Sequence, residues 1–557
     1  MLPSHCKAIQ LTGHGAATST QDGSKLTERR VRSAMNIVQK LIATLLVLVL
    51  AGMVLAQQSG GAIIIGTGNL PTTLDSGDAN DGNSIAVTSQ ITEKLITHAP
   101  GTTTLMPALA KSWTGNEDST VWVFELEQGV RFHDGTPFNA EAVKFSLDRW
   151  NDPENPYRYS ASGKAYPGWG ALFGGFLGSG SALDRVTVLD EYTVQLELNR
   201  SVSFLPAILA SGYFGFDSPT AVMAAGADYG TPKVGSVGTG PFEFGLWEEG
   251  TRIVLNANPD YRKGPPASAQ LVFVGVGDAT ARIAQLKAGA LDVVYGLAQG
   301  DLPSLESDPN VEIVRSSTGG LNTSMLSMHQ SQPPFDDVRV RQAVSYAIDR
   351  QALVDAFDNG EVPAAKDILP PNLWGHADVE PYTYDPERAR ELLAEAGYPN
   401  GFDTELWYRE TARFRLGMVE AMASYLAEVG IRASLKTEDA AAFLQDQLTG
   451  KFPLYTAGWN ADFADPDTFI YTFYGPTSMQ RFGWDAPDVV ALTEQARKAP
   501  TQAERAVLYA EVMAIAHEAA PSLPLAHGTP FMAIRKGVQG VVINPLGGLP
   551  SMAGVSK

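Results

Sequence analysis

Hydrophobic positions follow strand and helix periods in turn along most of the chain. Short apolar or alternating runs at 62–66 and 122–126 are typical of β-strands. Apolar residues recur at helical spacing after Asn139, Asp278 and Thr501, and each of these residues is suited to cap the N-terminus of a helix. Thr501 also opens a Thr-x-x-Glu capping box. This alternation predicts an α/β fold of two or three units.

One stretch shows neither period. Residues 151–183 are rich in Gly, Pro, Tyr and Ser, so we expect a surface loop there. No segment of 20 to 50 residues repeats along the chain, which argues against a solenoid or a propeller.

The longest apolar run, Leu41–Leu55, precedes the small residue Ala56. It is short for a membrane span and matches the hydrophobic region of a secretory signal peptide. We therefore expect residues 1–56 to be an N-terminal extension plus signal peptide, with the true start at Met35 and cleavage after Ala56. An uncleaved anchor helix is the alternative, and Arg29-Arg30 leaves a twin-arginine signal open.

Composition excludes several classes of function. The formal net charge of -20 disfavours binding to nucleic acid, whose phosphates attract basic surfaces. The single cysteine, Cys6, allows no internal disulfide, no cysteine-based metal site and no lipoprotein anchor at the cleavage site. The sequence contains neither a Gly-x-Ser-x-Gly elbow nor a Gly-Lys-Ser/Thr phosphate loop. We therefore expect no enzyme activity, no cofactor and no metal site.

Five stretches of the chain carry a recognisable pattern in a fixed order. They are HDGTPFNAEAVKFSLDR within 105–149, GTGPFEFGLWEEG within 238–266, FDDVRVRQAVSYAIDR within 333–350, YDPERARELLAEAGYPNGF at 384–402 and GWNADFADPDTF at 458–469. With them the chain resembles the family 5 extracellular solute-binding proteins of ABC importers, the dipeptide, oligopeptide and nickel-binding group. The similarity covers roughly residues 62–545.

The resemblance implies a bilobed periplasmic-binding-protein fold of type II, peptide-binding-like, with an additional third domain. Lobe I would combine residues 57–102, 212–317 and 521–557, the third domain would be 103–211, and lobe III would be 318–520. The resemblance also implies a periplasmic monomer that closes over its ligand and delivers it to an inner-membrane permease with ATPase subunits.

The candidate site lies in the acidic and aromatic stretch that follows residue 455. A carboxylate beside an indole can hold an ammonium group by a charge-assisted hydrogen bond and cation-π attraction. In peptide-binding relatives, the aspartate three residues after this tryptophan pairs with the peptide α-amine, which corresponds here to Asp462 after Trp459. The alternative is that Asp462, Asp465 and Asp467 only cap turns.

A peptide carboxylate needs a cation as well. Some relatives place an arginine three residues before the tryptophan, but this chain has Thr456 there. Arg409, Arg413 and Arg415 are the substitutes in the same lobe, unless they are solvated surface charges. His329 is either a loop residue or, for a nickel cargo, the first histidine to examine.

The leading hypothesis is capture of di- or oligopeptides for an ABC importer. The fold carries many ligands, so a nickel chelate, an oligosaccharide or another amine-bearing solute remains an alternative cargo. A chaperone-like peptide binder and an exported hydrolase are the alternatives from other classes. The hydrolase is disfavoured because the sequence lacks a nucleophile elbow.

Overall fold

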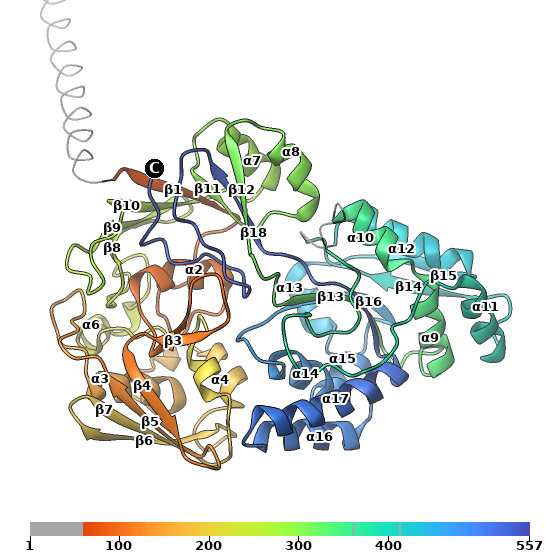
Figure 1. The fold of residues 1–557 in the computed structure, drawn as a ribbon, viewed down its shortest axis with the longest axis horizontal. Coiled ribbons are helices and arrows are strands. Elements are labelled where there is room, and N and C mark those ends of the chain that lie inside the picture. The colour runs from red at the N-terminus through yellow and green to blue at the C-terminus, as the bar shows by residue number, and fades with distance from the viewer. Residues whose placement is uncertain (1–59, 359, 361, 412–413) are drawn as a thin grey trace, which may run out of the picture. The chain divides into compact units, whose positions relative to one another are not determined.

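Residues 60–557, except 359, 361 and 412–413, are described by a computed structural model of the chain. Their strands form sheets of seven, five, four and two strands (Figure 1). The predicted signal peptide and its cleavage site lie outside the described residues. Within the described part of the chain, no helix combines the length and apolarity that crossing a membrane requires.

The seven-stranded sheet is built from stretches far apart in the sequence. Its order is β12-β18-β11-β1-β10-β9-β8, and β1 runs parallel to both of its neighbours. The strands are β1 (Ala62–Thr67), β8 (Phe242–Glu248), β9 (Arg252–Ala257), β10 (Gln270–Gly275), β11 (Val293–Val294), β12 (Val311–Arg315) and β18 (Phe531–Arg535). In Figure 1 the red β1, the green β10 and the blue β18 belong to this sheet.

Short helices and one small hairpin accompany the seven-stranded sheet in sequence. The α-helices are α2 (Gly82–Ile91), α6 (Pro219–Ala225), α7 (Ala279–Lys287) and α8 (Leu302–Glu306), and the hairpin pairs β2 (Ile96–His98) with β3 (Leu105–Pro107). Asp278 caps α7 through its side chain, as predicted, because the carboxylate accepts the hydrogen of the Ala281 N–H.

The five-stranded sheet has the order β15-β14-β16-β13-β17. Its strands are β13 (Asn322–Met328), β14 (Phe402–Trp407), β15 (Ile431–Lys436), β16 (Leu454–Asn460) and β17 (Ser522–Ala526). β17 pairs with β13 over four residues, so the expectation that lobe I takes every residue from 521 onward is wrong for this strand.

Most of the helices belong to the half of the chain that contains the five-stranded sheet. They are α9 (Val338–Ala347), α10 (Arg350–Phe357), α11 (Pro386–Glu395), α12 (Leu416–Glu428), α13 (Ala440–Asp446), α14 (Asp467–Tyr474), α15 (Ser478–Phe482), α16 (Pro487–Lys498) and α17 (Gln502–Ala519). The predicted capping box is present, since Thr501 and Glu504 satisfy each other's backbone N–H groups at the start of α17.

A separate antiparallel sheet, β4-β5-β7-β6, is formed by residues 110–198. It contains β4 (Ala110–Gly115), β5 (Val121–Leu126), β6 (Leu183–Asp190) and β7 (Thr193–Leu198), accompanied by α3 (Ala140–Asn151), α4 (Pro167–Phe173) and α5 (Leu205–Leu209). The side chain of Asn139 caps α3 as predicted.

The prediction of a surface loop over 151–183 is wrong for α4. Trp169 and Phe173 are buried and stack with their ring centroids 3.9 Å apart. A helix of seven residues is too short to display a helical period, and Gly168 within it is required because a Cβ there would lie 2.6 Å from the Tyr213 ring. Close packing of aromatic side chains therefore stabilises α4, and the sequence shows no helical period that would predict it.

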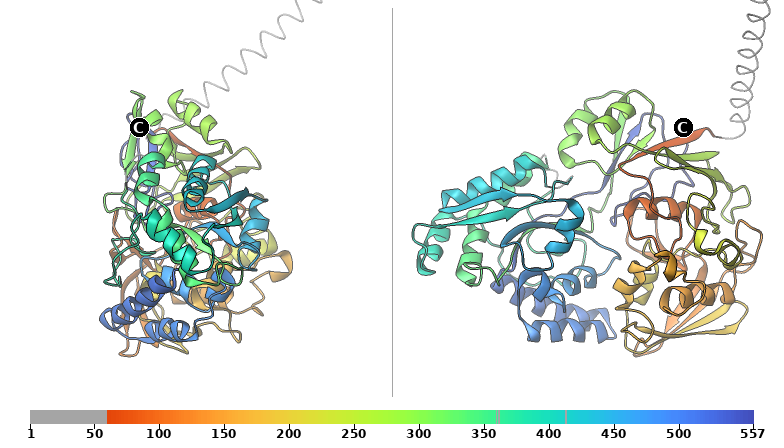
Figure 2. Two further views of the ribbon diagram at one scale, coloured as in Figure 1. Left: turned by 90° about the vertical axis from the view of Figure 1, so that its right-hand side faces the viewer. Right: turned by 180° about the vertical axis from the view of Figure 1, so that it is seen from behind.

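Two chain segments, 316–321 and 527–530, connect the seven-stranded and five-stranded sheets (Figures 1 and 2). The Asn322 side chain ties them together, because it donates to the Gly528 carbonyl at 2.6 Å and accepts from the Gly528 N–H at 2.8 Å. Gly320 allows this approach, since a Cβ on it would lie 2.1 Å from the Gly528 oxygen. The two crossings form a narrow double connection of the kind that permits hinge motion.

Candidate functional site

A cavity of about 310 Å³ lies at the end of β16, and we call it the arginine cavity. Its wall includes six residues that are used in the argument below: Arg409, Thr456, Trp459, Asn460, Phe473 and Arg481. Arg409 and Trp459 are two of the six residues proposed from the sequence as ligand contacts, so the fold brings these two to one cavity.

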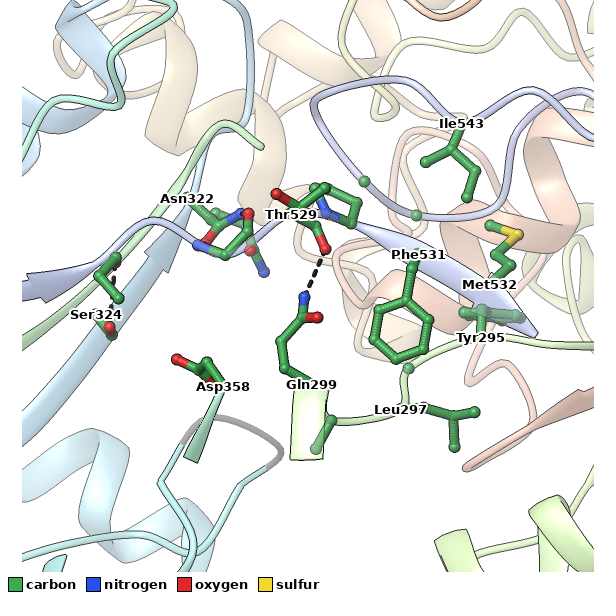
Figure 3. Close-up of a pocket in the computed structure, with 18 of the residues that line it drawn as sticks. Tyr295, Leu297, Gln299, Asn322, Ser324, Asp358, Thr529, Phe531, Met532 and Ile543 are labelled. Carbon is green, nitrogen blue, oxygen red and sulfur yellow. Dashed lines mark hydrogen bonds between the residues drawn. The ribbon is translucent and has the colours of Figure 1, made fainter. Parts of the chain in front are cut away.

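A second cavity, of about 320 Å³, lies against the crossing segments, and we call it the hinge cavity (Figure 3). Its wall includes Tyr295 and Gln299 from the side of the seven-stranded sheet and Asn322 from β13. The Gln299 side chain donates to the Thr529 carbonyl at 2.6 Å. Asn460 lines both cavities, so they adjoin at the end of β16.

Trp459 and Asp462 are held by the same hydroxyl group. The Trp459 indole N–H lies 3.5 Å from Thr468 Oγ1, and the Asp462 backbone N–H donates to that oxygen at 3.1 Å. Thr468 stands in the first turn of α14, which begins directly after the loop that carries Asp462. The position of the indole relative to the carboxylate is thus fixed by the start of this helix.

The Asp462 side chain is half-buried and faces the other half of the molecule. Its Oδ1 accepts a hydrogen bond from the Tyr213 hydroxyl at 2.9 Å. Burial raises the pKa of Asp462, and hydrogen bonds from Tyr213 and Thr468 offset part of that effect. No cation of the described residues forms an ion pair with Asp462. The carboxylate thus has no cationic partner in the described part of the chain, and Asp462 is not among the residues that line the two cavities.

Asp465 and Asp467 have a structural role that goes beyond capping turns. Asp465 accepts the backbone N–H of Asp467 at 2.9 Å, as a turn residue would. It also binds the buried guanidinium of Arg505 through two hydrogen bonds, of 2.5 and 2.8 Å. Asp467 accepts from the Tyr509 hydroxyl at 2.9 Å and lies 3.3 Å from Arg497. Both carboxylates are committed to this buried network.

The three arginines proposed from the sequence have different surroundings. Arg409 lines the arginine cavity and is half-buried. Arg413 lies outside the described residues. Arg415 instead forms an ion pair with Asp301 at 2.8 Å, which connects the start of α12 to the start of α8. Of the described members of this group, Arg409 is the one that lines a cavity near Trp459.

His329 lines neither of the two cavities. It is buried, its Nδ1 lies 2.8 Å from Ser331 Oγ, and its ring packs against Gly450 and Gly483. Burial lowers the pKa of His329. Among residues 60–557 without the four undescribed positions, no group of three or more His, Cys, Asp or Glu side chains is placed to hold a metal ion.

Two residues of this region were not anticipated from the sequence, Tyr213 and Arg481. The Arg481 Cζ lies 5.6 Å from the centroid of Trp459 and 5.2 Å from that of Phe473. Burial lowers the pKa of Arg481. No local motif marks either residue, since Tyr213 is about 250 positions from its partner and Arg481 belongs to a five-residue helix.

Known proteins resemble this chain over most of its length. A profile of the bacterial extracellular solute-binding proteins, family 5, middle region, matches residues 104–481. The heme-binding protein A of Haemophilus influenzae is 34% identical over 481 residues, which cover 83% of this chain and 86% of that protein. The dipeptide-binding protein of Escherichia coli is 32% identical over 501 residues, which cover 86% and 90%.

Solved structures with a similar fold are known. The periplasmic binding protein DppA of Helicobacter pylori, in complex with the peptide STSA, is similar with a TM-score of 0.76 and 28% identity. The match covers 90% of this chain and 98% of that one. The similarity confirms the bilobed type II fold with an additional domain that the sequence resemblance implied.

Proposed function

The chain belongs to the bacterial extracellular solute-binding proteins of family 5, and we propose that it captures short peptides with a free α-amino group for an ABC importer in the membrane. Its role in this proposal is binding and delivery without a covalent change to the cargo. The permease with its ATPase subunits would receive the loaded protein, which acts as a monomer.

The observation that carries this proposal is the pair of opposite, unpaired charges, Asp462 and Arg409, in the region of Trp459. Asp462 has no cationic partner and Arg409 has no anionic partner among the described residues, and both are half-buried. A partly buried charge without a partner costs free energy, which a ligand of opposite charge can offset. A zwitterion would supply both missing charges at once.

We assign the groups of the peptide accordingly. The α-ammonium would bind Asp462 Oδ2, because Oδ1 is occupied by the Tyr213 hydroxyl. The face of Trp459 would add cation-π attraction, and Arg409 would bind the terminal carboxylate in bidentate fashion. The hinge cavity, which adjoins at Asn460, offers room for a longer chain.

Calorimetric titration with Ala-Ala tests the assignment of the amine. Asp462→Ala should weaken binding by about 2 to 5 kcal/mol, or roughly 30-fold to several thousand-fold, since it removes one partner of a buried charge pair. Asp403→Ala is the matched control, because Asp403 is an exposed carboxylate that pairs with Arg432 in the same half of the chain. N-acetyl-Ala-Ala should not bind.

Haemin is the competing cargo to include in the same titrations, because one relative is named as a heme-binding protein. Tight binding of haemin with no binding of Ala-Ala would overturn the peptide proposal. Equal binding of Ala-Ala to wild type and Asp462→Ala would remove Asp462 from the site.

We further propose that the molecule works as a closing clamp after export. Lobe I would comprise residues 57–102, 212–317 and the chain from the crossing segment 527–530 onward, and the third domain would be 103–211. Lobe III would then be 318–526, which includes β17. Small-angle scattering should give a smaller radius of gyration with peptide than without it.

The signal peptide would be cleaved after Ala56. N-terminal sequencing of the exported protein should then begin at Gln57.

A further inference from the structure

The arginine cavity contains more positive charge than one terminal carboxylate requires. Arg409 and Arg481 both line it, and no Asp or Glu of the described residues does. Neither guanidinium forms an ion pair with a described residue, whereas most other arginines of this half of the chain have an acidic partner. Two unpaired, half-buried guanidinium groups in one small cavity are costly unless anionic groups reach them.

Arg481 is held in place by its backbone and by aromatic rings. The Tyr455 hydroxyl donates to the Arg481 carbonyl at 2.6 Å, and the guanidinium lies near the faces of Trp459 and Phe473. The aromatic contacts provide no hydrogen-bond acceptor, and the buried Nε has no hydrogen-bond partner in the described part of the chain. A guanidinium fixed by aromatic rings with free donors suits bidentate binding of a carboxylate.

We propose that Arg481 binds a second carboxylate of the ligand, so that the preferred cargo is a short peptide with an acidic residue at its C-terminus. The inference rests on the proposed function, in which Asp462 takes the α-ammonium and Arg409 the terminal carboxylate. The acidic side chain would then enter the arginine cavity beside Trp459. Thr456, which stands where some relatives have an arginine, leaves this cavity without a third described cation.

The test compares Ala-Glu with Ala-Gln, which have nearly the same shape and differ in one charge. Calorimetric titration of the full chain should show that wild type binds Ala-Glu about 10- to 100-fold more tightly than Ala-Gln. In Arg481→Gln this preference should fall to about threefold or less, while the affinity for Ala-Gln stays near that of wild type. The ligand-free variant should unfold at or above the wild-type temperature, because it loses an uncompensated cation.

Arg432→Gln is the matched control, since Arg432 is exposed and pairs with Asp403 at 2.5 Å; it should keep the full preference. Equal binding of the two peptides by wild type would overturn the role of Arg481 and leave the proposed function standing. An equal loss of both peptides in Arg481→Gln would show that Arg481 only positions Trp459, which also overturns the inference. If neither peptide binds wild type, the proposed function fails first.

Discussion

The Tyr213 hydroxyl donates a hydrogen bond of 2.9 Å to Asp462, and this bond joins two halves of the molecule that are far apart in sequence. Tyr213 follows α5, near the sheet of β4 to β7, whereas Asp462 follows β16 of the five-stranded sheet. The residue expected to hold the amine is therefore also a contact between the halves. The proposed binding of the peptide amine and the contact between the two halves therefore involve the same carboxylate, that of Asp462.

Tyr213→Phe should lower the affinity for Ala-Ala by about 10-fold, mainly through faster release. The reason is that a hydrogen bond to a charged group, worth about 1.5 to 3 kcal/mol, no longer holds the halves together over the ligand. Stopped-flow displacement measures the release rate. Tyr384→Phe is the control, because Tyr384 donates to the Glu428 carboxylate within one half and should leave the rate unchanged. An unaltered release rate in Tyr213→Phe would exclude this role in closure.

Affinity for a free-amine peptide should fall as the pH is lowered through the raised pKa of Asp462. Burial raises the pKa of Asp462 above its usual 3.8, so its carboxylate takes up a proton at a higher pH than an exposed aspartate does. Only the ionised form attracts the ammonium, and below the raised pKa the affinity should drop about 10-fold per pH unit. Titrations of Ala-Ala between pH 4 and 7.5 measure the effect. The same pH dependence in wild type and in Asp462→Asn would place the amine elsewhere.

Asp465→Ala should destabilise the protein strongly, in contrast to Asp462→Ala. It leaves the buried Arg505 guanidinium without its carboxylate, which costs about 3 to 5 kcal/mol of the free energy of unfolding. Asp462 has no cationic partner, so its removal costs only the hydrogen bonds that it accepts, about 1.5 to 3 kcal/mol, and the relief from burying an unpaired carboxylate offsets part of that loss. Denaturant unfolding of both variants gives the comparison. Similar losses in the two variants would contradict the division of roles within this loop.

The buried Asp217 predicts a stability that declines as pH rises. Burial, together with the neighbouring Asp75, raises the pKa of Asp217 to about 7, while the unfolded chain loses this proton near 3.8. Between these two values the folded state holds one more proton, so each pH unit removes up to about 1.4 kcal/mol of stability; above pH 7 the loss is complete. Asp217→Asn should remove this slope. The unfolding midpoints of wild type and Asp217→Asn, measured at pH 5, 6, 7 and 8, should approach each other as the pH falls. Midpoints that differ by the same amount at every pH would contradict this prediction.

Local signals in the sequence predicted where several helices begin. The structure that depends on contacts between distant residues could not be predicted in this way. Asn139, Asp278 and Thr501 cap helices as expected, since a cap depends on three or four consecutive residues. The buried α4 was missed because its stability comes from aromatic packing within a seven-residue helix. Hydrophobic periodicity in the sequence identifies amphipathic helices and strands that are long enough to show the period, and a helix of seven residues is too short for this.

The same distinction applies to the site. Trp459 and Asp462 are candidates because three positions separate them in a recognisable stretch, and Arg409 is a candidate by its position in the same lobe; their contact with a ligand stays a prediction. Arg481 and Tyr213 reach the region through tertiary structure alone. His329 lines neither cavity and is buried beside Gly450 and Gly483, and its role as a ligand contact stays a prediction.

The position of β18 in the seven-stranded sheet determines the order in which the halves can form. β18 lies between β12 and β11, although it is the last strand of the chain. All strands of the other two large sheets precede it in sequence, so those sheets can form while the chain is still being made or translocated. The seven-stranded sheet must wait for residues 531–535 and for contacts of very high sequence separation, which form slowly. A chain that ends before β18 would thus present a finished binding half attached to an unfinished one.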